Sequence, residues 1–184
     1  MATKTELRQR IKALRDAMTS QQVAEKSAGI EARVLDLAQI KQARSVFVYV
    51  SVGNEVQTHG LIEHLLQRGK VVAAPLVVRP GVMEPHQIDS LDDLAPGRFN
   101  IPEPTTGRRY DAAIDVCIVP GVAFTEQGDR LGKSGGYFDR FLAVHSSTVS
   151  IGLCYEAQLI EALPTDADDR PVQIIVTDSR VIRA

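Results

Sequence analysis

From Ser45 to Asp178, short apolar runs alternate with segments of helical periodicity, and this alternation restricts the fold most. The runs are SVFVYV, KVVAAPLVV, DVCIVP, VSIGLCY and VQIIVTD. Runs that are apolar at every position are typical of strands buried on both faces of a mostly parallel sheet. Helical segments between them predict a three-layer α/β fold with helices on both faces. Pro75 suggests an edge or an interruption in the second run.

The first 44 residues predict an N-terminal helical arm packed on the α/β core. Thr3 with Glu6, and Thr19 with Gln22, have the spacing of helix-capping boxes, and apolar residues recur behind each pair at helical intervals. Residues 79–110 are rich in proline and glycine and predict loops with one short hairpin. The length favours a single domain over residues 1–184.

Composition excludes several classes of protein. A net charge of -2 argues against a dedicated nucleic-acid binder, and no apolar run is long enough to span a membrane. The N-terminus lacks the apolar core of a secretory signal. Cys117 and Cys154 lie in apolar runs and are expected to be buried free thiols. We expect a cytoplasmic monomer or weak homodimer with no nucleic-acid or membrane partner.

The loop from Pro120 to Gly136 is the best candidate for a ligand site. It follows a predicted strand and enters a predicted helix, and it contains Gly128, Gly132, Gly135 and Gly136 with Arg130 and Lys133 among them. Glycines let a backbone approach a ligand closely, and the free N–H groups of a helix start attract anions. Because two cations stand beside them, the loop predicts a phosphate site.

Two familiar motifs overlap this loop without fitting it. Gly132-Lys133-Ser134 resembles the end of a Walker A loop, but Gln127 stands where that motif requires glycine. Residues 132–136 also match the G-x-S-x-G nucleophile elbow. Asp139 and His145, however, lie on the helix that follows the loop, so they cannot serve as the separate partners of a triad. The histidines show no metal-ligand spacing.

The run PGVAFTEQGDRLGKSGGYFDRFL resembles the signature of the 5-formyltetrahydrofolate cyclo-ligase family. Shorter similarities occur in the same order as in that family: Lys4-x-x-Leu7-Arg8, Asn54-Glu55-Val56-x-Thr58, Gly69-Lys70, Ile101-Pro102-Glu103-Pro104 and Asp169. The departures are Ser134 where glycine is usual, Thr125 where aspartate is common, and Phe138 where a second tyrosine is expected.

The resemblance implies ATP-dependent closure of 5-formyltetrahydrofolate to 5,10-methenyltetrahydrofolate, with ADP and phosphate released. It implies that Arg130 and Lys133 are catalytic, that Val50 and Glu55 bind folate together with residues 133–137, and that Asp139 and Asp169 hold Mg²⁺. The implied ATP-binding residues are Lys4, Arg8, Arg130, Leu131, Gly132, Lys133, Ser134, Gly135, Gly136, Tyr137 and Phe138. The implied folate-binding residues of the loop are Lys133, Ser134, Gly135, Gly136 and Tyr137.

Two alternatives remain open at this level. One is a phosphotransferase that uses the same loop on another small molecule, for which a pterin-binding carboxylate such as Glu55 has no purpose. The other is a non-catalytic paralogue that binds folate or nucleotide, which Ser134 and Phe138 would favour.

Overall fold

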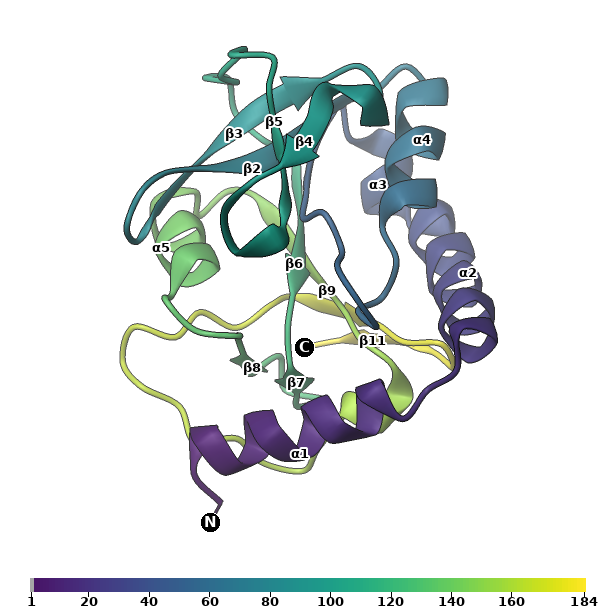
Figure 1. The fold of residues 1–184 in the computed structure, drawn as a ribbon, viewed down its shortest axis with the longest axis vertical. Helices are drawn as coiled ribbons and strands as arrows, with labels where there is room; N and C mark the ends of the chain where they lie inside the picture. The colour runs from purple at the N-terminus through teal and green to yellow at the C-terminus, as the bar shows by residue number, and fades with distance from the viewer. Residues whose placement is uncertain (1) are drawn as a thin grey trace.

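A seven-stranded sheet forms the centre of the computed structural model, which describes residues 2–184 (Figure 1). Its strand order is β11-β10-β9-β6-β1-β2-β3. Strands β10, β9, β6, β1 and β2 are parallel, and only the outer strands β3 and β11 pair antiparallel. The strands are β1 (Ser45–Val48), β2 (Val71–Arg79), β3 (Val82–Ile88), β6 (Val116–Pro120), β9 (Val149–Leu153), β10 (Ile174–Val176) and β11 (Val181–Arg183). The predicted mostly parallel α/β sheet is confirmed.

Helices cover both faces of the sheet because successive strand residues point to opposite sides. Val46 and Val48 of β1 pack in the core beneath α2, α3 and α4, whereas Phe47 packs beneath α5. The ring centroids of Phe47 and Phe141 are 4.6 Å apart. The helices are α1 (Lys4–Asp16), α2 (Ser20–Asp36), α3 (Ala38–Gln42), α4 (His59–Gln67) and α5 (Tyr137–Val144). The three-layer arrangement is therefore also as predicted.

Helix α1 lies across the end of the sheet rather than over a face (Figure 1). Its buried residues Leu7 and Ile11 contact Leu163 and the small hairpin of β7 (Ala123–Phe124) and β8 (Arg130–Leu131). Both predicted capping boxes, at Thr3 and at Thr19, are formed. The N-terminal arm consequently brings its polar residues to the end of the sheet where the glycine-rich loop begins.

The segment 79–110 contains more structure than the sequence suggested. It includes the whole of β3 and the short hairpin of β4 (Leu94–Pro96) and β5 (Pro102–Pro104). Strand β3 was missed because Pro85 interrupts its pattern; opposite it lies Pro75, so neither residue needs to donate a backbone hydrogen bond there. Strand β2 is not an edge, and β3 takes that position. The described residues also form three 3-10 turns: η1 (Leu91–Asp93), η2 (Arg98–Asn100) and η3 (Glu156–Gln158).

Within residues 2–184, no helix is both long and apolar enough to cross a membrane. Cys117 and Cys154 are free and fully enclosed by the core, as expected. Burial raises the pKa of both thiols well above the usual range of cysteine, since a thiolate would lose its hydration there.

We expect both thiols to be unreactive in the native protein, because the thiolate is the species that reacts with disulfide reagents. Titration with an aromatic disulfide at pH 8 should detect no rapidly reacting thiol without denaturant and both thiols in guanidinium chloride. Fast modification of either thiol in native buffer would show that the core around it opens readily.

Candidate functional site

The sheet reverses its winding between β1 and β6, and a cavity of about 570 Å³ opens there. From β1 the chain continues to β2 on one side, while β6 is followed by β9 and β10 on the other. Open α/β sheets bind ligands at such a switch point, outside the carboxyl ends of the strands. The cavity walls include every site residue inferred from the sequence: Lys4, Arg8, Val50, Glu55, Arg130, Leu131, Gly132, Lys133, Ser134, Gly135, Gly136, Tyr137, Phe138, Asp139 and Asp169.

The glycine-rich loop enters α5 through two successive left-handed residues. Gly135 and Gly136 have φ of 79° and 60°, which glycine adopts without strain. The first N–H groups of α5 have no partner within the helix, so this turn offers donors to an anion. Ser134 has no positive φ, and a side chain at this position therefore imposes no backbone strain.

Two arginines hold the backbone of this loop from opposite sides. Arg8 of α1 donates from Nε to the carbonyl oxygen of Gly132 at 2.9 Å. Arg140 of α5 donates to the carbonyls of Gly135 and Gly81. The loop is therefore fixed in place before any ligand binds.

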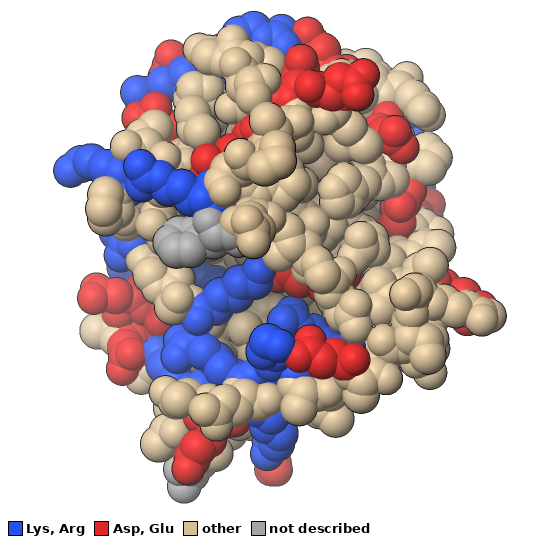
Figure 2. Space-filling model, in the orientation of Figure 1, with Lys and Arg blue, Asp and Glu red and all other residues tan. Residues whose placement is uncertain are grey.

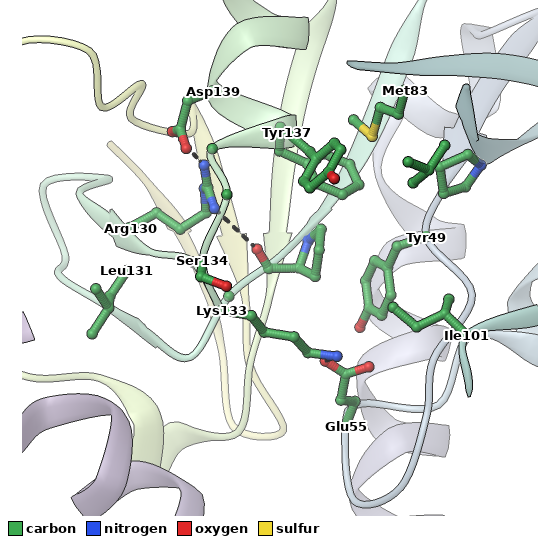
Figure 3. A pocket seen from close by; sticks show the side chains of 18 of the residues that line it. Tyr49, Glu55, Met83, Ile101, Arg130, Leu131, Lys133, Ser134, Tyr137 and Asp139 are labelled. Atoms are coloured by element: carbon green, nitrogen blue, oxygen red, sulfur yellow. Dashed lines mark hydrogen bonds and ion pairs between the residues drawn. The ribbon is translucent and has the colours of Figure 1, made fainter. Parts of the chain in front are cut away.

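Arg130 is a fixed charge in the cavity wall. Its side chain is only 3% exposed, and Nη2 lies 2.5 Å from Oδ1 of Asp139. Nη1 donates to the carbonyl of Pro120 at 3.4 Å, and Nε is buried without a hydrogen-bond partner (Figure 3). Asp139 also accepts from the backbone N–H of Arg170. A buried donor that lacks a partner costs free energy, so the ion pair with Asp139 must offset this cost to hold Arg130 in place.

Lys4 joins the first helix to the segment before β10. Its ammonium contacts Asp169 at 2.6 Å and Asp166 at 2.7 Å. Burial alone would raise the pKa of Asp169, but hydrogen bonds from Lys4 and from the N–H of Asp166 outweigh it and hold that pKa below its usual value. Burial alone would lower the pKa of Lys4, but hydrogen bonds to the carboxylates of Asp166 and Asp169 outweigh it and raise that pKa. Asp168 is exposed and does not line the cavity.

Glu55 lies in the turn that follows β1 and is almost completely buried. Its Oε2 accepts from the N–H of Val52 at 3.0 Å, which closes the turn on itself. Tyr155 donates from its hydroxyl to the carbonyl of Glu55 at 3.0 Å, and Arg15 places Nη1 3.9 Å from Oε1. Tyr155 is a core residue, and the sequence indicated neither it nor Arg15 as part of the site. Neither carries a local signal, because both reach Glu55 from distant parts of the chain.

Lys133 extends from the glycine-rich loop across the cavity to Glu55 (Figure 3). The Nζ–Oε1 distance is 2.8 Å, and the lysine side chain is 44% exposed. The predicted phosphate-binding loop and the predicted folate anchor thus face each other across one cavity.

The remaining wall is largely apolar and comes from the segment after β1, from strands β2 and β3 and from the hairpin β4–β5. Phe138, which stands where the family has a tyrosine, packs against Phe47 of the core, with ring centroids 6.0 Å apart. Residues of this wall that the sequence did not indicate are Tyr49, Val52, Pro75, Val77, Met83 and Arg98. Ile101 and Glu103 also line it, and they belong to the segment 101–104 that resembles the family. Figure 2 shows Lys and Arg side chains gathered over α1 below the hollow. A flat ligand with a negatively charged extension suits this combination.

Two carboxylates are suitable for a divalent cation. Asp139 and Asp169 line the same cavity, and each has one oxygen with no hydrogen bond among the described residues. Residues 2–184 contain no cluster of three or more potential protein ligands. Mg²⁺ commonly binds through one or two carboxylates together with phosphate oxygens and water, so this donor set fits a cation that arrives with a nucleotide.

Comparison with known proteins gives consistent results. Residues 1–178 match the model of the 5-formyltetrahydrofolate cyclo-ligase family. The 5-formyltetrahydrofolate cyclo-ligase of Escherichia coli strain K12 is 33% identical, over 93% of this chain and 98% of that protein. The solved structure of 5,10-methenyltetrahydrofolate synthetase from Aquifex aeolicus has a TM-score of 0.87 at 31% identity, covering 98% of this chain and 92% of that one. The synthetase from Mycoplasma pneumoniae, 21% identical with a TM-score of 0.78 over 96% of this chain and 99% of that one, shares the fold.

We expect Asp169→Asn to lower the free energy of unfolding by about 1 kcal/mol at pH 7, because it removes the charged partner of Lys4. The pKa of Asp169 is depressed in the folded state, so its contribution is present above about pH 4 and is lost as the pH falls through the folded value. Urea unfolding of both proteins should therefore show a difference that narrows below pH 4. Asp168→Asn is the matched control and should unfold like the parent at every pH.

Proposed function

Because this chain belongs to the 5-formyltetrahydrofolate cyclo-ligase family, we propose that it uses ATP to convert 5-formyltetrahydrofolate to 5,10-methenyltetrahydrofolate. Its membership of the family confirms the resemblance seen in its sequence. The observation that carries the detailed proposal is the position of Lys133. It lies in the glycine-rich loop just before α5 and extends to a buried carboxylate across one cavity. A nucleotide and a pterin would meet at this point.

The chemistry requires activation of an unreactive carbon. The formyl group on N5 is amide-like, and its oxygen is a poor leaving group. Attack of that oxygen on the γ-phosphorus of ATP releases ADP and leaves a phosphate ester on the formyl carbon. N10 then attacks this carbon and loses its proton, and phosphate departs with the C–O electrons to give the methenyl bridge. Every step is an addition or a displacement on substrate atoms, so the protein needs no nucleophile of its own.

We assign the triphosphate to the glycine-rich end of the cavity. The free N–H groups at Gly135 and Gly136 and the cations Arg8, Arg130 and Lys133 provide donors for phosphate oxygens. Arg130 and Lys133 are the proposed catalytic cations. Arg130 is fixed by Asp139, so it stabilises developing charge without having to reorganise during the reaction.

We assign the folate to the opposite end. Glu55 would accept hydrogen bonds from the amino and ring N–H groups of the pterin, and Val50 would contact its face. The apolar residues of β2, β3 and the hairpin β4–β5 would cover the rest of the ring system. Tyr137, which the resemblance assigns to both ligands, lines the same cavity, and its ring centroid lies 5.7 Å from the guanidinium carbon of Arg140.

Asp139 and Asp169 would hold Mg²⁺ together with phosphate oxygens. The cation would neutralise part of the charge on the triphosphate, as divalent cations do in phosphoryl transfer. Lys4 contacts Asp169 and so sets the position of that carboxylate at the nucleotide end. Three further properties remain predictions from the sequence: a cytoplasmic location, a monomeric or weakly dimeric state, and partners that are all small molecules.

The structure favours neither alternative. A phosphotransferase for another small molecule gains nothing from a buried, pre-positioned Glu55 that faces the phosphate loop. A non-catalytic paralogue was suggested by Ser134 and Phe138, but Ser134 is unstrained and Phe138 has a packing partner in Phe47.

The direct test is to mix the protein with 5-formyltetrahydrofolate and Mg-ATP and to follow the near-ultraviolet absorbance of the methenyl product. We expect product to form in proportion to ADP, and its formation to stop when the divalent cation is chelated. ADP release without the methenyl product would instead support the phosphotransferase. Binding of either ligand without turnover would support the non-catalytic paralogue.

Glu55→Gln should weaken binding of 5-formyltetrahydrofolate by about one to two decades, since a hydrogen bond to a charged group contributes about 1.5–3 kcal/mol. The affinity for the nucleotide should change much less, because Glu55 lies at the other end of the cavity. Calorimetric titration with each ligand alone measures both constants. Equal weakening of the two would mean that Glu55 supports the cavity as a whole.

A further inference from the structure

The ion pair between Lys133 and Glu55 joins two groups that the proposed function assigns to different ligands. Glu55 accepts from the pterin in that proposal, and Lys133 binds phosphate oxygens. In the ligand-free structure these groups satisfy each other instead, at 2.8 Å. Neither ligand can take its full set of contacts until this pair separates.

The surroundings allow the lysine to move while the loop does not. Arg8 and Arg140 hold the backbone on both sides of residue 133 through the carbonyls of Gly132 and Gly135. The lysine side chain is 44% exposed and makes no other ion pair with the described residues. A lysine ammonium is a point charge on a flexible four-carbon stem, so rotation of the side chain alone can carry it from Glu55 to a nucleotide bound at the same loop.

Glu55, in contrast, is held in place. Its Oε2 accepts from Val52, and its carbonyl accepts from the buried hydroxyl of Tyr155. Arg15, whose side chain is 12% exposed, keeps a second positive charge 3.9 Å from Oε1. When Lys133 leaves, the carboxylate therefore stays in position with a cation beside it, and its Oε1 becomes available to a ligand.

From this geometry we propose that Lys133 is an exchangeable partner which couples the two substrate sites. The inference rests on the function proposed above. In the free protein Lys133 occupies Glu55 and opposes folate binding. A bound nucleotide draws Lys133 to its phosphates and exposes Glu55, so each substrate increases the affinity for the other. The coupling is reciprocal, because separation of one ion pair serves both binding events.

Binding without turnover tests the coupling. Calorimetric titration of 5-formyltetrahydrofolate is carried out with and without magnesium and adenylyl imidodiphosphate, an ATP analogue whose β–γ bridge is an imido group. We expect the folate dissociation constant of the parent protein to fall about tenfold when the analogue is present, at the lower end of typical couplings because the lysine is partly exposed.

Lys133→Met separates this inference from any other cause of coupling. With no lysine on Glu55, folate should bind the nucleotide-free variant severalfold more tightly than it binds the parent. The saturating analogue should then produce little further change. Lys133→Gln, which also removes the charge, should behave in the same way. The matched control is Lys12→Met, which removes an exposed lysine that pairs with Asp16 outside the cavity and should leave both constants at the parent values.

Two results with the Lys133 variants would overturn the inference. If Lys133→Met and Lys133→Gln bind folate no more tightly than the parent without nucleotide, then Lys133 does not oppose the folate. If they retain the parent's coupling at saturating analogue, the coupling has another origin. If the parent protein binds no folate, the proposed function is wrong as well. If it binds both ligands but neither affects the affinity for the other, only this inference is wrong.

Discussion

The parallel pairing of β1 with β6 determines where everything else in the site must lie. Val46, Phe47 and Val48 pair with residues 116–118, so the two strands end at the same edge of the sheet. The chain leaves β1 into the Glu55 turn and leaves β6 toward the glycine-rich loop. The next strands are added on opposite sides, so no further strand separates these two exits. Each side of the resulting cavity is a turn that follows a buried strand, and the rigid sheet holds the two turns opposite each other.

Much of this arrangement follows from local patterns in the sequence. The continuous apolar runs indicated buried parallel strands, the capping residues marked the starts of α1 and α2, and the glycines with Arg130 and Lys133 marked the loop. The prediction missed two strands that lack a clear local pattern. Pro85 concealed β3, and the antiparallel return of β11 had no distinct signal after the run that forms β10. A periodic pattern can be recognised only in an uninterrupted run of several residues. Pro85 interrupts β3, and β11 contains only three residues.

The pairing of charges could not be read from the sequence at all. Lys4 and Asp169 are 165 positions apart, and Tyr155 reaches Glu55 across 100 positions. A charge on a helix surface has the same appearance in sequence whether it faces solvent or a cavity, and only the folded chain decides which. Arg15 illustrates this: it lies in the last turn of α1, where a basic residue is ordinary, yet its guanidinium is buried beside Glu55. The family resemblance supplied Lys4, Arg8 and Asp169 but gave no sign of Arg15 or Tyr155.

The packing of α1 has a consequence for the order in which the protein acquires its structure during synthesis. This helix is synthesised before the segments on which it packs, because its apolar contacts Val122, Leu131 and Leu163 lie more than a hundred residues later in the sequence. At about 5–20 residues per second, Leu7 and Ile11 wait roughly ten seconds for their partners. A helix of 13 residues is marginal in water on its own, so it has little reason to persist during that interval. Helix α1 is thus among the last elements to settle, and its basic residues reach the cavity only after the segments around Leu131 and Leu163 have been synthesised.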